Sequence, residues 1–430
     1  MTAVADSPTE GLDQPVPGPG QVAILGAGPI GLDAALACLD NGWPCTVYES
    51  AASVAANVDA WSHIRLFTPW SMNVSTRMDA RLRAAGLAPP GPAEHCPTGA
   101  EFAEQLLRPL AELPQLAAVI RNHTRVLAVA RQGLLKHEQI GSTQRGAQPF
   151  RLLLESPDGV EHVEHADLLL DCTGSYDRAN CLGDGGIPAP GEQQLANRIM
   201  RRIPDLHGAP DEWADRRVLL VGAGKSAQTT AGDLAQLVVA RPGTQVLWAV
   251  RAADPDWGEV PGDPLEQRQK LVEVAQRLRS GAVPGVDVRT GVVVEALRAA
   301  DDDADHGVVV TLRSNSGDVE EIVVDRIIGL TGFVGDTSLY RQLQVHECYA
   351  TAAPMNLSAA LLGAAGSTTG PADCLAQASH GVDALRVPEP NFFVLGMKSY
   401  GRNSTFLLRV GYEQVDEVVN AYAHPQTAQL

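Results

Sequence analysis

The stretch Val22-Ala-Ile-Leu-Gly26-Ala-Gly28-Pro29-Ile30-Gly31 decides the fold, because it leads a buried strand directly into a helix through three glycines. The residues before Gly26 are all apolar, as in a strand that is covered on both faces of a parallel sheet. Gly26 permits the tight turn, Gly28 lets the backbone approach a pyrophosphate, and Gly31 lets the helix pack against the strand. The phosphates would lie at the helix N-terminus, whose free N–H groups favour negative charge. The turn residues, Pro29 and Ile30 included, are therefore predicted to bind a dinucleotide.

An acidic residue follows this turn at the distance that suits FAD. Glu49 ends the next predicted strand, Thr46–Glu49, and lies 21 residues after Gly28. A carboxylate at this place accepts hydrogen bonds from a ribose diol and would repel a 2′-phosphate. The first glycine turn together with Glu49 therefore predicts an FAD site.

A second glycine turn of the same kind lies in the middle of the chain, in Arg217-Val-Leu-Leu-Val-Gly222-Ala-Gly224-Lys225-Ser226-Ala227. Ala227 is a permitted variant at the third position of the motif. Arg251 ends the next predicted strand, where a cation accommodates the 2′-phosphate of NADP, and Lys225 and Ser226 are expected to add phosphate contacts. Two such turns in one chain predict two dinucleotides, a flavin and a nicotinamide, and hence redox chemistry.

The composition excludes several other classes of protein. The chain has 430 residues, 45% of them hydrophobic, and a net charge of −18, which argues against nucleic acid or an anionic membrane as a partner. No run approaches the ~20 apolar residues of a membrane helix. Seven widely spaced cysteines without a Cys-x-x-Cys pair indicate a reducing cytoplasm, and neither a zinc site nor another metal site is expected.

The order of patterns predicts an α/β fold with two Rossmann-like dinucleotide-binding domains, the NAD(P)H domain inserted into the FAD domain. Residues 1–20 form a disordered lead, 21–180 and 336–430 the FAD domain, and 213–335 the NAD(P)H domain. Thr98 with Glu101 forms a capping box that starts a helix over 98–113. The other expected elements are strands near 126–130, 150–155, 167–172, 245–251, 286–294, 307–313, 321–330 and 392–396, and helices over 30–39, 265–279 and 404–421.

These motifs, in this order, resemble the flavin-containing, NADPH-dependent monooxygenase-like group of flavoproteins. The resemblance implies that Thr173-Gly174 and Thr331-Gly332 are the crossings between the two domains and bind the cofactors. It also implies that Gly396, Met397 and Lys398 lie at the pyrimidine or ribityl end of the flavin. Arg65, Trp70 and Asn73, in the segment after the ribose acid, are expected to line the flavin and substrate pocket as catalytic candidates. One departure is the stretch 203–213, which only loosely matches the F-x-G-x-x-x-H segment of that group.

The resulting hypothesis is an FAD enzyme that takes hydride from NADPH and reacts with O₂. A flavin hydroperoxide then oxygenates a small nucleophilic substrate. The first alternative is a reductase or dehydrogenase that passes electrons to a quinone, a thiol or another acceptor, for which a distant pair such as Cys348 and Cys374 stays open. The second alternative is a flavin-binding redox sensor with little turnover. Homodimers are common in the group that the chain resembles, although the sequence shows no interface stripe.

Overall fold

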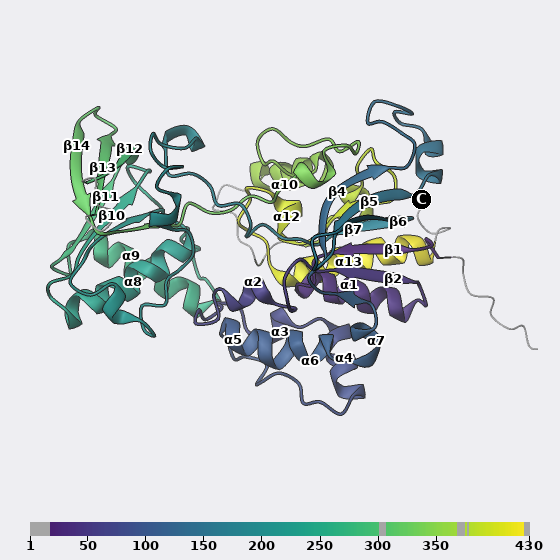
Figure 1. Ribbon diagram of the computed structural model, residues 1–430. Coiled ribbons are helices and arrows are strands. Elements are labelled where there is room, and N and C mark those ends of the chain that lie inside the picture. Colours follow the sequence, from purple (N-terminus) through teal and green to yellow (C-terminus); the bar gives the residue numbers. More distant parts are fainter. Residues whose placement is uncertain (1–17, 301–306, 368–374, 376–377, 425–430) are drawn as a thin grey trace, which may run out of the picture.

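The computed structural model describes residues 18–300, 307–367, 375 and 378–424. Two parallel sheets organise two halves of the molecule, and two chain segments cross between the halves (Figure 1). The predicted disordered lead lies almost wholly outside the described residues. None of the helices within the described ranges is long and apolar enough to cross a membrane.

The first half is built on a five-stranded parallel sheet with the strand order β16-β7-β1-β2-β3. Residues of β1 alternate between two cores, since Val22 and Ile24 face the helices while Ala23 and Leu25 face a small antiparallel sheet. This burial on both faces explains why the strand is apolar throughout. The strands are β1 (Val22–Leu25), β2 (Cys45–Tyr48), β3 (Ile120–Arg121), β7 (Leu168–Asp171) and β16 (Phe392–Val394).

Helices cover one face of this sheet and the antiparallel sheet β4-β5-β6 covers the other. The predicted capping box is confirmed, because Thr98 Oγ1 accepts from Glu101 N (3.1 Å) and Glu101 Oε2 accepts from Thr98 N (2.7 Å). The elements are α1 (Pro29–Asp40), α2 (Ala56–Asp59), α3 (Trp70–Asn73), α4 (Thr76–Ala84), α5 (Gly99–Phe102), η1 (Ala103–Leu107), α6 (Arg108–Ala111), α7 (Pro114–Ala117), β4 (Arg125–Arg131), β5 (Phe150–Glu155), β6 (Glu161–Ala166), α10 (Met355–Ser367), α11 (Val382–Leu385), α12 (Met397–Tyr400) and α13 (Leu408–Ala423).

The second half repeats the plan with a parallel sheet of order β11-β10-β9-β15-β8. Helices α8 and α9 pack on one face, and the antiparallel sheet β12-β13-β14 packs on the other. The elements are β8 (Ile199–Met200), β9 (Arg217–Val221), α8 (Lys225–Ala240), β10 (Gln245–Val250), α9 (Glu266–Arg279), β11 (Val286–Thr290), β12 (Val292–Ala299), β13 (Val308–Ser314), β14 (Val319–Val324) and β15 (Arg326–Gly329).

The structure differs from the predicted elements in several places, and α10 and β3 are among the elements that the sequence did not predict. The predicted strand 286–294 is two strands that break at Gly291, where φ is 69°, and 321–330 breaks at Asp325. In both cases the two pieces belong to different sheets, which a continuous apolar run cannot reveal. Strand β6 was not predicted because Glu and His residues occupy four of its six positions. Strand β8 joins the second sheet from outside the predicted range 213–335.

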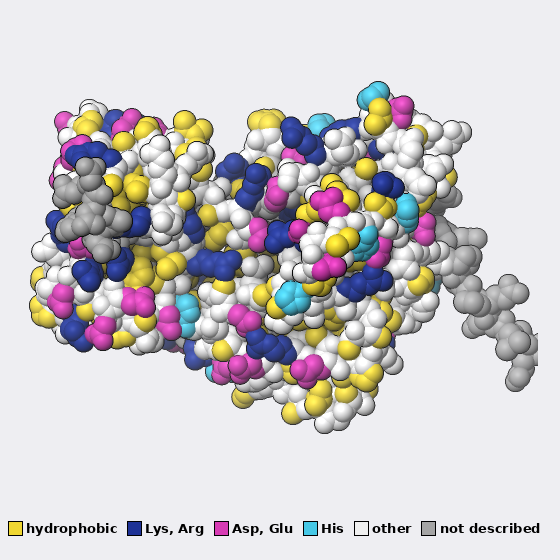
Figure 2. Space-filling model, in the orientation of Figure 1, with side chains coloured by type: hydrophobic (Ala, Val, Ile, Leu, Met, Phe, Trp, Pro, Cys, Tyr) yellow, Lys and Arg dark blue, Asp and Glu magenta, His cyan; other side chains and the backbone are white. Residues whose placement is uncertain are grey.

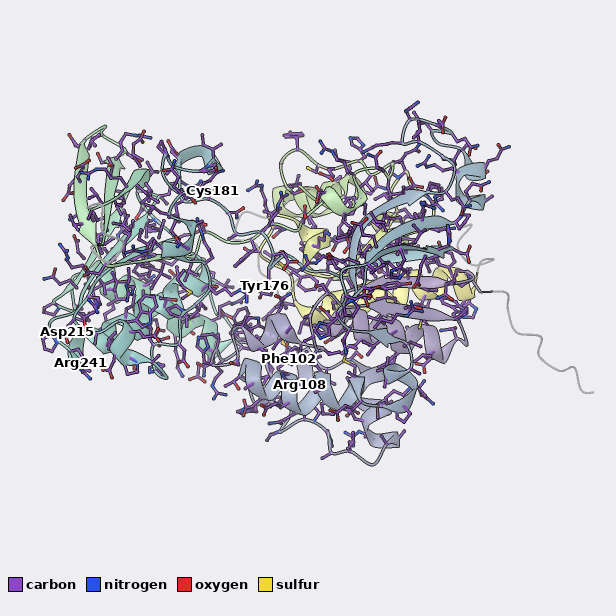
Figure 3. All side chains as sticks on the ribbon, viewed as in Figure 1. Phe102, Arg108, Tyr176, Cys181, Asp215 and Arg241 are labelled. Carbon is purple, nitrogen blue, oxygen red and sulfur yellow. The ribbon has the colours of Figure 1, made fainter. Side chains whose placement is uncertain are left out.

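The two crossing segments pair with each other as a short ribbon. Asn180 N donates to Gly332 O (2.9 Å), Thr331 Oγ1 donates to Asn180 O (2.8 Å), and Val334 N donates to Arg178 O (3.0 Å). Figure 3 shows Tyr176 between the two halves, and its ring meets Phe333 edge-on at 5.4 Å. The halves are thus connected through paired backbone.

Candidate functional site: two glycine turns at sheet edges

The first glycine turn leaves a helix N-terminus open toward solvent. Gly26 has φ of 92°, and a Cβ on Gly31 would overlap the Gly26 carbonyl oxygen, so neither position accepts a side chain. A Cβ on Gly28 would meet no atom within 4 Å, and no side chain caps α1 at this N-cap residue. The residues therefore fit a pyrophosphate, which would occupy the open space beside Gly28 and accept from the first turn of α1.

The carboxylate of Glu49 is fixed beside this turn. Its Oε2 accepts from Ala27 N (2.8 Å) and its Oε1 accepts from Ala51 N (2.9 Å). Oε2 keeps a lone pair for a further donor, such as a ribose hydroxyl group, whereas Oε1 also accepts a long hydrogen bond from Ser50 Oγ (3.5 Å). The sequence placed Glu49 near the turn by spacing, and the structure shows the backbone bonds that orient it.

Lys398 lies in a buried ion pair at the carboxyl edge of the first sheet. Its Nζ is 2.6 Å from Asp171 Oδ2 and 3.0 Å from Thr173 Oγ1, and both charged side chains are at most 2% exposed. The ring of Tyr340 lies 5.1 Å from the same nitrogen. The protein thus neutralises this charge itself, and a direct flavin contact of Lys398 stays a prediction. Sequence analysis missed Asp171, although a carboxylate that ends an all-apolar strand was a visible signal.

The predicted crossing and C-terminal glycines adopt conformations that favour glycine. Gly174 has φ of 72°, Gly332 of 88° and Gly396 of 73°. Gly396 N donates to Gln414 Oε1 (2.8 Å) on α13, and Met397 begins α12 directly after it. The Gly396 turn is therefore tied to α13. Its contact with a flavin stays a prediction, as do the cofactor contacts of Thr173 and Thr331.

The second glycine turn has the same geometry. Gly222 has φ of 132° and its Cβ would overlap the Leu330 carbonyl oxygen, whereas a Cβ on Gly224 would meet nothing within 4 Å. Ala227 is buried in the helix packing that a small residue permits. Trp248 Nε1 donates to Gly222 O (2.7 Å), a contact that sequence analysis did not anticipate. This turn also fits a pyrophosphate at a helix N-terminus.

The predicted phosphate-binding side chains of the second turn differ in their surroundings. Lys225 Nζ donates to the carbonyl oxygens of Trp257 (2.9 Å) and Gly258 (3.3 Å), so it holds the loop after β10. Ser226 is exposed at the start of α8. Arg251 is exposed at the end of β10, and within the described ranges no ion pair or hydrogen bond engages its guanidinium. Arg251 is thus the predicted cation that is available to a 2′-phosphate.

The catalytic candidates Arg65, Trp70 and Asn73 are held by neighbouring protein groups. Arg65 Nη1 donates to Cys96 O (2.6 Å), and the buried Trp70 ring lies 6.0 Å from the Phe102 ring. Asn73 is buried and exchanges two hydrogen bonds of 2.9 Å with Thr68. These contacts show packing and support of the segment, and a role of these side chains in a substrate pocket stays a prediction.

The cysteine at the first glycine turn is an ordinary buried thiol. Cys172 contacts the Gly26–Gly31 turn, and burial raises its pKa well above the usual range, so it stays protonated. Cys348 is different, because hydrogen bonds from Thr351 and Ala350 lower its pKa. The six described cysteines are free, and Cys374 lies outside the described residues. Across the described ranges no cluster of His, Cys, Asp and Glu suits a metal ion.

Charges of both signs alternate on the face seen in Figure 2, where Lys and Arg are interspersed with Asp and Glu. Figure 3 shows Phe102 and Arg108 in the helical region below the first sheet, and Cys181 at a crossing segment. This mixed face carries no broad basic field of the kind that binds nucleic acid.

The comparisons with known proteins agree with this geometry. The family model described as pyridine nucleotide-disulphide oxidoreductase matches residues 20–350. Kynurenine 3-monooxygenase of Mycosarcoma maydis is 29% identical over 250 residues, which cover 54% of this chain and 39% of that protein. The chain thus spans well under half the length of this curated relative.

Solved structures share the fold over nearly the whole chain. Bacillithiol disulfide reductase from Bacillus cereus has a TM-score of 0.66 at 18% identity and covers 95% of this chain and 99% of its own. The reduced form of ornithine hydroxylase from Pseudomonas aeruginosa has a TM-score of 0.57 at 17% identity and covers 94% and 98%. Proteins with this fold thus include both a disulfide reductase and a hydroxylase.

Proposed function

The chain belongs to the pyridine nucleotide-disulphide oxidoreductase family, whose enzymes pair FAD with NAD(P)H, and from this premise we propose that it is an NADPH-dependent monooxygenase. In the proposed reaction NADPH, a proton, O₂ and a small nucleophilic substrate give NADP⁺, water and the oxygenated substrate. Bound FAD would supply the redox chemistry. The protein would hold the flavin at Gly26–Gly31 and Glu49, and the nicotinamide nucleotide at Gly222–Ala227.

The protonated, buried state of the Cys172 thiol is the observation that favours a monooxygenase over a disulfide reductase. A disulfide reductase needs a thiolate that can attack a disulfide near the flavin. Cys172 is the thiol at the flavin turn, and its burial and raised pKa make it a poor nucleophile. The names of the monooxygenase relative and of the structurally similar hydroxylase also support the proposal. The cysteine usage further supports a cytoplasmic enzyme.

Stopped-flow absorbance of the FAD-loaded protein tests the proposal. The protein is reduced anaerobically with NADPH and then mixed with O₂, with and without candidate nucleophiles. We expect bleaching of the flavin within seconds, and then a transient band that is blue-shifted from oxidised flavin. A protein that only senses redox state would not bleach. Direct return to oxidised flavin with stoichiometric peroxide, under every condition, would contradict a monooxygenase.

The preference for NADPH is proposed to depend on Arg251. Because its guanidinium is exposed and unpaired within the described residues, Arg251→Ala should remove the charge that meets the 2′-phosphate. We expect the KM for NADPH to rise about tenfold, as the loss of a charged hydrogen bond implies, and the KM for NADH to stay unchanged. Arg298→Ala, on the outer sheet, is the control. An unchanged KM for NADPH would show that Arg251 does not bind the 2′-phosphate.

A disulfide reductase is the second candidate, and the lowered pKa of Cys348 favours it. Its test is anaerobic oxidation of NADPH with a small disulfide as acceptor, compared between the unmodified protein and Cys348→Ser. Turnover that the variant loses would establish the reductase. Turnover with quinones that survives the substitution would establish a dehydrogenase instead.

A further inference from the structure

One face of α13 carries three charged side chains, two of which accept hydrogen bonds from the backbone of the segment 379–381. Arg409, Glu413 and Glu417 follow at intervals of four residues, so they share a face of the helix. Glu413 pairs with Arg409 Nη1 through Oε1 (2.6 Å) and accepts from Ser379 N through Oε2 (3.1 Å). Glu417 Oε1 accepts from Gly381 N (3.0 Å), and within the described ranges no cation pairs with this carboxylate. The cluster therefore retains one uncompensated negative charge.

Three buried polar atoms of this cluster have no hydrogen-bond partner in the described part of the chain: Glu417 Oε2, Ser379 Oγ and Tyr400 OH. Tyr400 is fully buried. Burial raises the pKa of the Tyr400 hydroxyl to about 12. The negative charges of Glu413 and Glu417 contribute to this rise, and the positive charge of Arg409 opposes it. The hydroxyl of Tyr400 thus lies within electrostatic range of both carboxylates, and it forms no hydrogen bond with either of them.

Such a set of atoms implies a missing partner. Each buried polar atom without a hydrogen bond costs about 1–3 kcal/mol, so native proteins rarely keep three of them together. The three atoms can all accept, and the charge at Glu417 requires a cation. An alkylammonium group has one positive charge, three N–H donors and no acceptor, which matches this set.

We propose that Glu417, Tyr400 and Ser379 bind the ammonium group of a small primary amine, and that this amine is the substrate. That the amine is the substrate rests on the proposed monooxygenase function. Tyr400 ends α12, four residues after the Gly396 turn, and Gln414 of the same α13 holds the backbone of Gly396. The amine would therefore bind next to the predicted flavin contact. The substrate carries, besides this cationic anchor, the nucleophilic atom that is oxygenated.

Calorimetric titration of the FAD-loaded protein tests the site with three probes of similar size. The probes are n-butylammonium, the neutral n-butanol, and tetramethylammonium, which has the charge but no N–H donor. We expect n-butylammonium to bind with one site per chain, and the other two to bind at least about tenfold more weakly, because each lacks one of the two features that the cluster recognises.

Variants of the cluster locate the binding. Glu417→Gln should weaken binding of n-butylammonium at least about tenfold, and Tyr400→Phe should weaken it several-fold. Asp416→Asn is the matched control, because it removes one negative charge from the same helix at an exposed position that pairs with Arg77, and it should bind as the unmodified protein does. Flavin content and melting temperature show that each variant is folded.

The outcomes separate this site from the proposed reaction. No binding of n-butylammonium, equal binding of tetramethylammonium, or unchanged binding by folded Glu417→Gln would each overturn the site. Binding that depends on Glu417, in a protein that gives no transient band with O₂, would keep the site and reject the monooxygenase. A transient band in a protein that does not bind the amine would support the monooxygenase and reject the amine site.

Discussion

At the scale of single residues, the ion pair of Lys398 and Asp171 shows how the protein compensates a buried charge at the carboxyl edge of the first sheet. Thr173 donates to Asp171 Oδ1 through both its backbone nitrogen (3.1 Å) and its hydroxyl (2.7 Å), so the carboxylate is surrounded by donors. A buried charge of this kind is tolerated only while its partners stay in place. The pair therefore ties α12 to the end of β7 more than it adds net stability.

Lys398→Met should destabilise the protein by about 3–5 kcal/mol, because it leaves the Asp171 carboxylate buried and unpaired. The double variant Lys398→Met with Asp171→Asn should recover part of this loss. Urea unfolding of the four proteins in this cycle measures both effects. Lys270→Met, which breaks an exposed pair with Glu266, is the control and should cost less than about 1 kcal/mol. Additive single effects would contradict a coupled pair.

At the scale of elements, two glycines of the first turn have different roles: Gly31 is needed for folding, and Gly28 is expected to be needed for FAD binding. A Cβ on Gly31 would overlap the Gly26 carbonyl oxygen, so Gly31→Ala should shift α1 and lower both the stability and the FAD content. A Cβ on Gly28 meets only open space in the protein. Gly28→Ala should therefore keep the melting temperature of the FAD-free protein while it lowers FAD affinity. Equal FAD affinity in Gly28→Ala would place the pyrophosphate elsewhere.

Asp33 links α1 to α4 and makes the stability of the fold depend on pH. The carboxylate is fully buried, Ser75 and Arg77 donate to it, and burial raises its pKa to about 6 from the usual 3.8. The folded protein therefore binds the proton more tightly than the unfolded chain does. This stabilising contribution is complete below about pH 4 and is lost as the pH rises through about 6.

Asp33→Asn removes this titrating group. Relative to the variant, the unmodified protein should lose about 3 kcal/mol of unfolding free energy between pH 4 and pH 7, the equivalent of about two pKa units. Denaturant unfolding at several pH values measures the difference. Asp79→Asn, at an exposed pair with Arg83, should give a curve parallel to that of the unmodified protein. Parallel curves for Asp33→Asn would show that Asp33 keeps an ordinary pKa.

At the scale of the whole molecule, the two halves have separate hydrophobic cores. The cores around the first sheet and those around the second share no residue, and the described connections between the halves include the two crossing segments and a hydrogen bond from Arg202 Nη2 to Asn57 Oδ1 (3.3 Å). The halves can therefore open independently. We expect two calorimetric unfolding transitions. NADP⁺ should raise the midpoint temperature of only one of them by mass action, and NAD⁺ should raise that temperature less. A single transition that shifts as a unit would contradict separate cores.

The sequence by itself determined the local features: the strand–turn–helix units at both glycine turns, the position of Glu49, and the Thr98 capping box. These depend on backbone sterics and on bonds between residues close in the chain, so a few neighbouring residues specify them. Only the tertiary structure decided that Lys398 meets Asp171, that 286–294 and 321–330 divide between two sheets, and that carboxylates of α13 accept from the backbone of the segment 379–381. Such contacts join residues far apart in the chain, and local patterns of hydrophobicity do not encode which distant partner will neutralise a charge or cover a strand.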